Sequence, residues 1–175
     1  MSEEVGAAPG KRQKLVEELA ATEVSYVSSL IAAQELFLQP LLRKLGTDEE
    51  VLSAEEVSVV FGNLQELIQA DKLLLFELQR RVGSWGASST IGDVFLSIFT
   101  DEFVLEYCTY VSHYGEAVKF LRRLRLTEKD HPALKYIAAQ ESKAQASAVN
   151  NLTSLLITPI QRVPRYVMIL KVGLG

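Results

Sequence analysis

The sequence predicts an all-α fold in a single domain. In several long stretches, apolar residues recur at alternating steps of four and three, the spacing that places them on one face of a helix. Glycine, proline and serine fall between these stretches, where helices are expected to end. A length of 175 residues fits one domain with one hydrophobic core.

The composition is that of a globular protein, with 48% hydrophobic and 23% charged residues. The net charge of −4 argues against a nucleic-acid-binding protein, which normally carries a basic balance or a basic stripe. Basic residues do cluster at Lys11 to Lys14 and at Arg122 to Arg125. Contact with phosphate or anionic lipid is one interpretation of each cluster, and a solvated helix end is the other.

The compartment is indicated by the cysteine count and by the absence of targeting signals. A single cysteine excludes an internal disulfide framework and suits a reducing environment. The opening Met1 to Gly10 lacks the basic and apolar halves of a secretory signal. No apolar run reaches the ~18 residues of a membrane span. We therefore expect a soluble, cytoplasmic protein without a transmembrane segment.

The first predicted element is a long helix that follows a flexible segment over residues 1–10. Its four-three stripe starts after Leu15 and comprises Leu19, Thr22, Tyr26, Ser29, Ala33 and Leu36. Pro40 is expected at a kink or near the end of this helix, and Gly46 is a plausible stop.

The second predicted helix begins at a capping box, Ser53-Ala54-Glu55-Glu56, and runs to about Val82. Its apolar side consists of Val57, Val60, Leu64, Leu67, Leu74 and Leu78. Gly62 lies inside this pattern and lowers helix propensity by roughly 1 kcal/mol against alanine. We expect that close packing, not chemistry, explains this glycine.

A loop over Gly83 to Thr90 separates this helix from the next elements. It lacks the Gly-Lys-Ser/Thr ending and the preceding strand of a phosphate-binding loop. A short element over Ile91 to Leu96 then leads into a long helix with an aromatic stripe, namely Phe103, Tyr107, Tyr110, Tyr114, Ala117, Leu121 and Leu124. Such a row is expected in the core. Asp130 is suited to cap the following helix, with Pro132 in its first turn.

The last predicted helix combines an apolar stripe with two prolines. The stripe comprises Leu156, Ile160, Val163, Val167, Leu170 and Leu174. Pro159 and Pro164 have no N–H, so they leave the carbonyls of Leu155 and Ile160 without helical partners and should bend or interrupt the helix. The polar side chains that could satisfy the freed carbonyls are Gln161, Arg162, Arg165 and Tyr166.

No set of residues indicates catalysis on a bound substrate or a metal centre. His113 lies five residues from Cys108, which misses the i, i+4 spacing for joint ligation on a helix, and His131 sits beside a turn proline. An enzyme with its own substrate is therefore disfavoured, and we expect neither a metal nor a cofactor.

Four segments in order resemble the Dbl-homology domain, a helical module that acts as a guanine nucleotide exchange factor (GEF) for Rho-family GTPases. Residues 18–30 match the Glu-Leu-x-x-Thr-Glu-x-x-Tyr-Val-x-x-Leu opening typical of that family. Residues 61–67 resemble its Phe-x-Asn-x-x-x-Leu region, and Tyr107 and Tyr110 echo its Tyr-x-x-Tyr. Residues 159–166, Pro-Ile-Gln-Arg-Val-Pro-Arg-Tyr, followed by an aliphatic run and Lys171, resemble its final signature.

The resemblance implies an elongated antiparallel helical bundle over residues 11–175 and exchange without covalent chemistry. The partner implied is a Rho-, Rac- or Cdc42-like GTPase, to which the nucleotide and Mg²⁺ belong. Glu23 would contact switch I, Lys171 would place a cation near switch II, and Leu156 would be an apolar contact. Spacing alone would make Glu23 a solvated helix residue, Lys171 a favourable charge at a helix C-terminus and Leu156 part of the core.

The same resemblance assigns a supporting role to the polar part of the signature. Gln161, Arg162, Arg165 and Tyr166 would orient the signature helix without touching the GTPase. Family members continue into a further long helix and commonly a pleckstrin-homology domain, so we expect the domain to be incomplete at its C-terminus. Peripheral membrane recruitment would then use other parts of a longer protein. A non-catalytic scaffold that binds a GTPase or another helical protein is the alternative.

Overall fold

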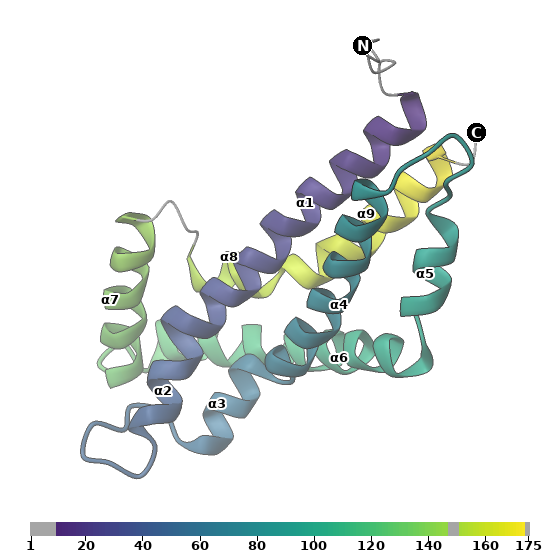
Figure 1. The fold of residues 1–175 in the computed structure, drawn as a ribbon. Helices are drawn as coiled ribbons and strands as arrows, with labels where there is room; N and C mark the ends of the chain where they lie inside the picture. Colours follow the sequence, from purple (N-terminus) through teal and green to yellow (C-terminus); the bar gives the residue numbers. More distant parts are fainter. Residues whose placement is uncertain (1–9, 147–150, 174–175) are drawn as a thin grey trace.

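A computed structural model describes residues 10–146 and 151–173 of the chain, and Figure 1 shows its fold. The described residues form helices and connecting loops, without a β-strand among them, so the predicted all-α fold is confirmed. The helices, with their bounds, are α1 (Lys11–Ala33), η1 (Gln34–Leu38), α2 (Gln39–Lys44), α3 (Ala54–Phe61), α4 (Leu64–Gly83), α5 (Gly92–Ile98), α6 (Asp101–Thr127), α7 (Pro132–Ala146), α8 (Leu152–Leu156) and α9 (Thr158–Gly173).

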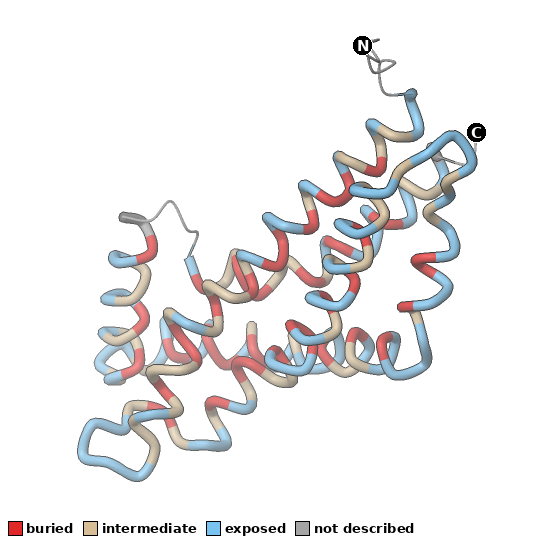
Figure 2. The backbone as a smooth tube through the Cα atoms, viewed as in Figure 1, coloured by how far each residue is buried: buried red, intermediate tan, exposed pale blue. Residues whose placement is uncertain are grey.

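Helix α1 packs along α4, and α8 and α9 cross it from another side. Helix α6 contacts α3, α4 and α9, and α5 contacts α4. The predicted stripes of α1, α3, α4 and α6 supply much of the core, and the buried residues lie on the sides of the helices that face one another (Figure 2). Fully buried leucines of the α1–α4 interface include Leu19, Leu30, Leu67, Leu74 and Leu78.

The end of the first long helix follows the prediction. The chain widens into a π-helical turn, η1, directly before Pro40, which lies in the first turn of α2. In a π turn, the backbone hydrogen bonds join residues five apart in place of four. Such a turn can accommodate proline, which has no N–H to donate. Helix α2 ends at Lys44, and Gly46 follows with a φ of 71°, a left-handed conformation suited to glycine.

The predicted continuous helix from Ser53 to Val82 is wrong in one respect, because Gly62 divides it. The capping box of α3 forms as expected, with Glu56 N–H donating to the Ser53 hydroxyl. Gly62 then adopts a φ of 52°, and α4 starts anew after Asn63. Close packing, the expected reason for this glycine, is not what excludes a side chain, because a Cβ on Gly62 would lie in ordinary van der Waals contact with the Cβ of His113, at 3.4 Å. The backbone conformation is therefore what requires glycine here.

The predicted stripe of α6 lies in the core except for Tyr114, which is only half-buried, and the helix starts at a Thr100 cap. Pro132 occupies the first turn of α7 as expected. The residue that serves the start of α7 is His131, because its Nδ1 accepts a hydrogen bond from Ala133 N–H at 3.2 Å. The prediction that Asp130 would cap this helix is therefore not supported.

The two prolines of the last segment act differently. Pro159 is the second residue of α9, directly after the break from α8 at Ile157, whereas Pro164 lies further inside α9. The freed carbonyl of Leu155 accepts a bond from the Thr158 hydroxyl at 2.7 Å, so the expected donors from the polar signature are not used there.

The face of α9 that packs on the bundle also differs from the predicted stripe. Val163 and Val167 are exposed, by 39% and 47% respectively, and Arg162 and Tyr166 are buried instead. Leu174 lies outside the described residues. The buried face of α9 is thus the polar side of the signature, and the reason lies in the partner that it meets on α1. Among the described residues, no helix is long and apolar enough to cross a membrane.

Candidate functional site

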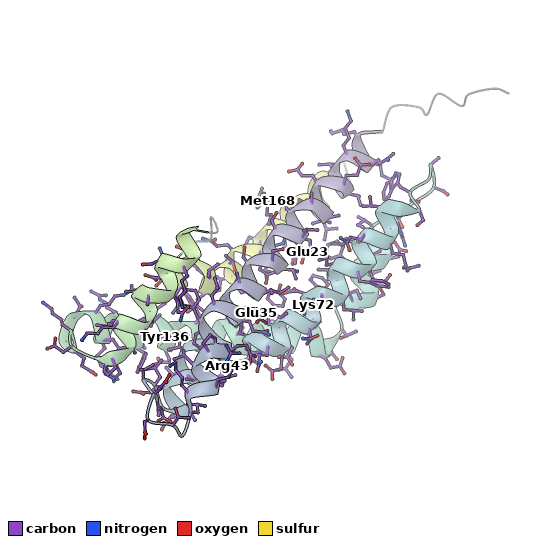
Figure 3. All side chains as sticks on the ribbon, turned by 60° about the vertical axis from the view of Figure 1, so that its left-hand side comes forward. Glu23, Glu35, Arg43, Lys72, Tyr136 and Met168 are labelled. Atoms are coloured by element: carbon purple, nitrogen blue, oxygen red, sulfur yellow. The ribbon has the colours of Figure 1, made fainter. Side chains whose placement is uncertain are left out.

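The candidate site lies where α9 crosses α1, and its centre is Glu23. This residue follows Leu19 and Ala20 and precedes Tyr26 and Val27 on the buried side of α1, so helix geometry places its carboxylate in the interior. Its relative exposure is 0%. Figure 3 labels Glu23 on α1 and Met168 on the neighbouring α9. A buried carboxylate requires a cation and hydrogen-bond donors.

Arg162 of α9 supplies both, and the sequence places it 139 residues further along the chain. Its Nε donates to Glu23 Oε2 at 2.9 Å, and an Nη group also contacts that oxygen. The other Nη group donates to the Thr22 hydroxyl at 3.1 Å. The guanidinium lies over the rings of Tyr26 and Tyr166, at 5.4 and 4.8 Å from their centroids. The guanidinium is thus held on several sides.

Tyr166, one turn further along α9, completes the pair. Its hydroxyl donates to Glu23, with distances of 2.8 Å to Oε1 and 3.0 Å to Oε2. Its ring packs edge-on against Phe95 and Phe99 near α5, at centroid distances of 5.7 and 5.8 Å. The two most specific motifs of the sequence, residues 18–30 and 159–166, are therefore joined through Glu23.

A second buried carboxylate, Asp71 of α4, lies behind this centre and was missed by the sequence reasoning. The Tyr107 hydroxyl donates to its Oδ1 at 2.7 Å and the Tyr26 hydroxyl to its Oδ2 at 2.9 Å. The two hydroxyl oxygens are themselves 3.0 Å apart. An aspartate on the apolar side of a helix, between Leu67 and Leu74, was the sequence signal that could have identified it.

Burial dominates the electrostatics of both carboxylates. It raises the pKa of Glu23, while the Arg162 charge and the hydrogen bonds from Tyr166 and Arg162 oppose the rise. The Glu23 carboxylate in turn holds the Arg162 pKa above its ordinary value, which is the behaviour of an ion pair. Burial raises the pKa of Asp71 to about 7, and the Glu23 charge contributes to that rise.

The remaining predicted site residues are placed as follows. Gln161, Arg165 and Lys171 are exposed on α9, and Lys171 lies in its last turn. Leu156 is 2% exposed and belongs to the core, which is the other role expected of it; its carbonyl accepts a bond from the Tyr110 hydroxyl at 2.8 Å. The structure therefore separates the polar signature into two buried side chains, Arg162 and Tyr166, and two exposed ones.

Two apolar hollows flank the outer side of α9. One, of about 600 Å³, lies between the start of α1, α5 and α9 and is lined in part by Leu15, Phe95, Leu96, Val167 and Leu170. The other, of about 570 Å³, lies between α6 and α9 and is lined in part by Phe103, Val104, Val111, Ile160 and Pro164. Phe99, Val163 and Tyr166 contribute to both. The outer side of α9 is thus a largely apolar surface with Gln161, Arg165 and Lys171 exposed on the same helix.

The histidines have local structural roles. His113 Nδ1 lies 2.9 Å from the Thr109 carbonyl on α6 and packs against Gly62, and His131 serves the start of α7. Within residues 10–146 and 151–173, no three His, Cys, Asp or Glu side chains gather in a way that could hold a metal ion.

Comparison with known proteins finds one family model, the RhoGEF domain, which matches residues 15–172. Curated relatives include Rac guanine nucleotide exchange factor B of Dictyostelium discoideum, 31% identical over 92% of this chain and 15% of that protein. Another is the human FYVE, RhoGEF and PH domain-containing protein 2, 32% identical over 91% of this chain and 24% of that protein. The chain thus spans only a minor part of these relatives.

Solved structures with the same fold include the DH/PH domains of p115-RhoGEF, with a TM-score of 0.76 and 26% identity over 95% of this chain and 45% of that one. An activated truncation of Vav1 gives a TM-score of 0.75 and 27% identity over 92% of this chain and 38% of that one. The PDZ-RhoGEF DH/PH domains in complex with RhoA give 0.77 at 21% identity, over 93% of this chain and 44% of that one, which shows likeness of fold alone.

Proposed function

The chain belongs to the RhoGEF domain family, and from that premise we propose that it is a guanine nucleotide exchange factor for a Rho-family small GTPase. The observation that carries the proposal is the family match over residues 15–172, which includes both motif helices and the site between them. The names of its relatives support the proposal, since they are called Rac or Rho guanine nucleotide exchange factors.

Exchange of this kind uses binding energy and no covalent chemistry of the exchange factor. The chain binds the GTPase, rearranges its switch regions and so favours the nucleotide-free state. By linkage, a factor that binds the empty GTPase more tightly must weaken nucleotide binding by the same ratio. The protein is then not an enzyme with a substrate of its own, and it holds no cofactor, because nucleotide and Mg²⁺ belong to the GTPase.

The surface that we assign to the GTPase is the side on which α1 and α9 meet. Lys171 is exposed in the last turn of α9 and would place its cation there, whereas Gln161 and Arg165, exposed on the same helix, keep the supporting role that the resemblance implies. Glu23 is buried in its pair with Arg162, so its contact with switch I requires that it leave this partner in the complex. Leu156 supports the α8–α9 junction from the core, and Arg162 and Tyr166 fix α9 on α1.

The partner is a Rho-, Rac- or Cdc42-like GTPase. We place the protein in the cytoplasm, which is supported by its single cysteine, Cys108, an exposed thiol that suits a reducing compartment. Recruitment to a membrane would use other parts of a longer protein.

Release of a fluorescent GDP analogue from a panel of Rho-family GTPases tests the function. We expect the chain to accelerate release, and Glu23→Ala and Lys171→Ala each to reduce the acceleration by at least tenfold. Lys171→Ala removes an exposed cation, and Glu23→Ala removes the carboxylate that would leave Arg162 to contact the GTPase. Lys129→Ala, an exposed lysine after α6, is the matched control and should retain full activity. A well-folded chain that accelerates release from no GTPase would contradict the proposal.

A scaffold without exchange activity is the second candidate, and the apolar outer side of α9 favours it because such a surface binds helical partners. Binding to a GTPase with unchanged nucleotide release would identify this role.

A further inference from the structure

The site contains two buried carboxylates and one buried cation. Glu23, Asp71 and Arg162 are the charged side chains that are buried among the described residues. We call the set of Glu23, Arg162, Tyr166, Tyr26, Asp71 and Tyr107 the buried network. If both carboxylates were ionised, the network would carry a net negative charge in the interior, which is costly. One proton would make it neutral.

The hydrogen bonds around Asp71 also have room for a proton. Its carboxylate, the Tyr26 hydroxyl and the Tyr107 hydroxyl form a triangle with sides of 2.9, 2.7 and 3.0 Å. Each tyrosine hydroxyl has one hydrogen to donate, so two tyrosines can supply only two of the three hydrogen bonds. A proton on Asp71 supplies the third. The three contacts are therefore compatible with a neutral carboxyl group, which gives each of them a hydrogen.

The groups that face Asp71 come from three helices. Helix α1 contributes Tyr26 and Glu23, α6 contributes Tyr107, and α9 contributes Arg162 and Tyr166. The negative charge of Glu23 opposes ionisation of Asp71, and the positive charge of Arg162 favours it. Arg162 lies over the same Tyr26 ring whose hydroxyl donates to Asp71. The protonation of Asp71 therefore depends on whether Glu23 remains beside Arg162.

We propose that Asp71 is a positioning residue that holds a proton in the free chain and releases it to solvent when Glu23 leaves Arg162 to contact the GTPase. This inference rests on the proposed exchange function. In the free chain, Arg162 is balanced by Glu23 and Asp71 is neutral. In the complex, Arg162 is balanced by the ionised Asp71. The interior is neutral in both states, and only the O–H bond of Asp71 is broken.

The sign of the pH dependence follows from this proton release. The pKa of Asp71, about 7 in the free chain, falls in the complex because the Glu23 charge is gone and that of Arg162 is unmatched. The complex then binds one proton fewer, so the affinity rises with pH below about pH 7, by at most about tenfold per pH unit. Above that pH, Asp71 is already ionised and the affinity levels off.

The free chain tests the first half of the proposal. Carbon-13 NMR of the Asp71 carboxyl group, assigned with Asp71→Asn, should show titration near neutral pH. Titration near pH 4, the ordinary aspartate value, would overturn the proposal. This measurement does not involve a GTPase.

Binding to a nucleotide-free GTPase tests the second half, with the member of the Rho family whose GDP release the chain accelerates most. From pH 6 to 7 the Kd of the natural chain should fall by about fivefold, because the ionised fraction of Asp71 in the free chain rises by about that factor around a pKa of about 7. The Kd of Asp71→Asn should change only as the GTPase itself titrates. Asp93→Asn is the matched control, because Asp93 is an exposed carboxylate that pairs with Arg81 and stays ionised over this range. It should keep the pH dependence of the natural chain.

A second variant covers the case in which Asp71→Asn does not fold. Tyr107→Phe keeps the carboxyl group and removes a hydrogen bond that lowers its pKa, so the pH at which the affinity levels off should move upward. Identical pH profiles for the natural chain and the network variants would overturn the coupling alone. Failure of the folded chain to bind any GTPase at any pH would overturn the proposed function and the coupling together, whatever Asp71 does in the free chain.

Discussion

Arg162 determines how the last helix is seated on the first. Its guanidinium is 3% exposed, so its removal leaves Glu23 buried without a cation. Removal of one partner of a buried ion pair lowers the free energy of unfolding by far more than the pair contributes as a whole. The reason is that the remaining charge stays buried, without water and without its counterion. Tyr166 alone, a neutral donor, cannot replace the cation.

We expect Arg162→Ala to lower the free energy of unfolding by about 3–5 kcal/mol in urea titrations. Arg123→Ala is the control, because its pair with Glu128 is exposed and should contribute about 1 kcal/mol or less. In the Glu23→Ala/Arg162→Ala double variant, the loss should be smaller than the sum of the single losses. A loss below about 1 kcal/mol for Arg162→Ala would show that Glu23 finds other partners.

The break between α3 and α4 shows how one residue divides an otherwise continuous helical pattern. The apolar periodicity of Val57, Val60, Leu64 and Leu67 continues across the break, since both helices bury the same side. Asn63, after the glycine, donates from its amide to the Glu106 carbonyl of α6 at 2.9 Å. The turn therefore attaches the α3–α4 junction to α6.

Gly62→Ala should lower the free energy of unfolding by at least about 1 kcal/mol. Residues with a Cβ rarely adopt this backbone conformation, with φ 52° and ψ −132°, and it costs them roughly 1–3 kcal/mol, whereas the added Cβ would be in ordinary contact with His113 at 3.4 Å. Gly115→Ala within α6 is the control, because no atom lies within 4 Å of its Cβ position and alanine favours helices. It should raise stability by up to about 1 kcal/mol, measured by thermal or urea unfolding. Equal effects of the two substitutions would contradict the role assigned to Gly62.

The bundle as a whole has a densely connected centre and a less connected end. Helices α1, α4, α6 and α9 meet around the buried network, whereas α7 packs mainly against η1 at the other end of α1 (Figure 1). The buried side chains of α7 are Ala133, Ile137 and Ala144, two of which are alanines. They bury less apolar surface than the rows of leucines on α1 and α4. Tyr136 adds a hydrogen bond from its hydroxyl to the Phe37 carbonyl at 2.8 Å, and Figure 3 shows its position on α7.

Hydrogen exchange should therefore be faster in α7 than in α1 and α4, because a helix with few buried contacts opens locally at a lower free energy. Tyr136→Phe removes the bond to Phe37 and should increase exchange in α7 by about threefold to tenfold, while exchange in α4 stays unchanged. Tyr114→Phe, a half-buried tyrosine of α6, is the control and should leave α7 unaffected. An increase of equal size throughout the bundle would mean that α7 opens only with global unfolding.

The sequence by itself determined the helical fold, the positions of most helices and the family. Periodicity is a local property, so the rows that begin at Leu19, Val57 and Phe103 identify helices without knowledge of their neighbours. The caps and stops at Ser53 and Gly46 are equally local, and they formed as predicted.

Only the tertiary structure decided which side of α9 is buried and what the polar residues do. The apolar row through Val163 and Val167 predicted one packing face, but burial depends on the element that a helix meets. Helix α9 meets Glu23, and a buried carboxylate is satisfied by Arg162 and Tyr166 and not by valine. The role of Asp71 depends likewise on tyrosines 45 and 36 residues away. Contacts between residues so far apart in the sequence depend on how the helices pack, so a local sequence pattern does not predict them.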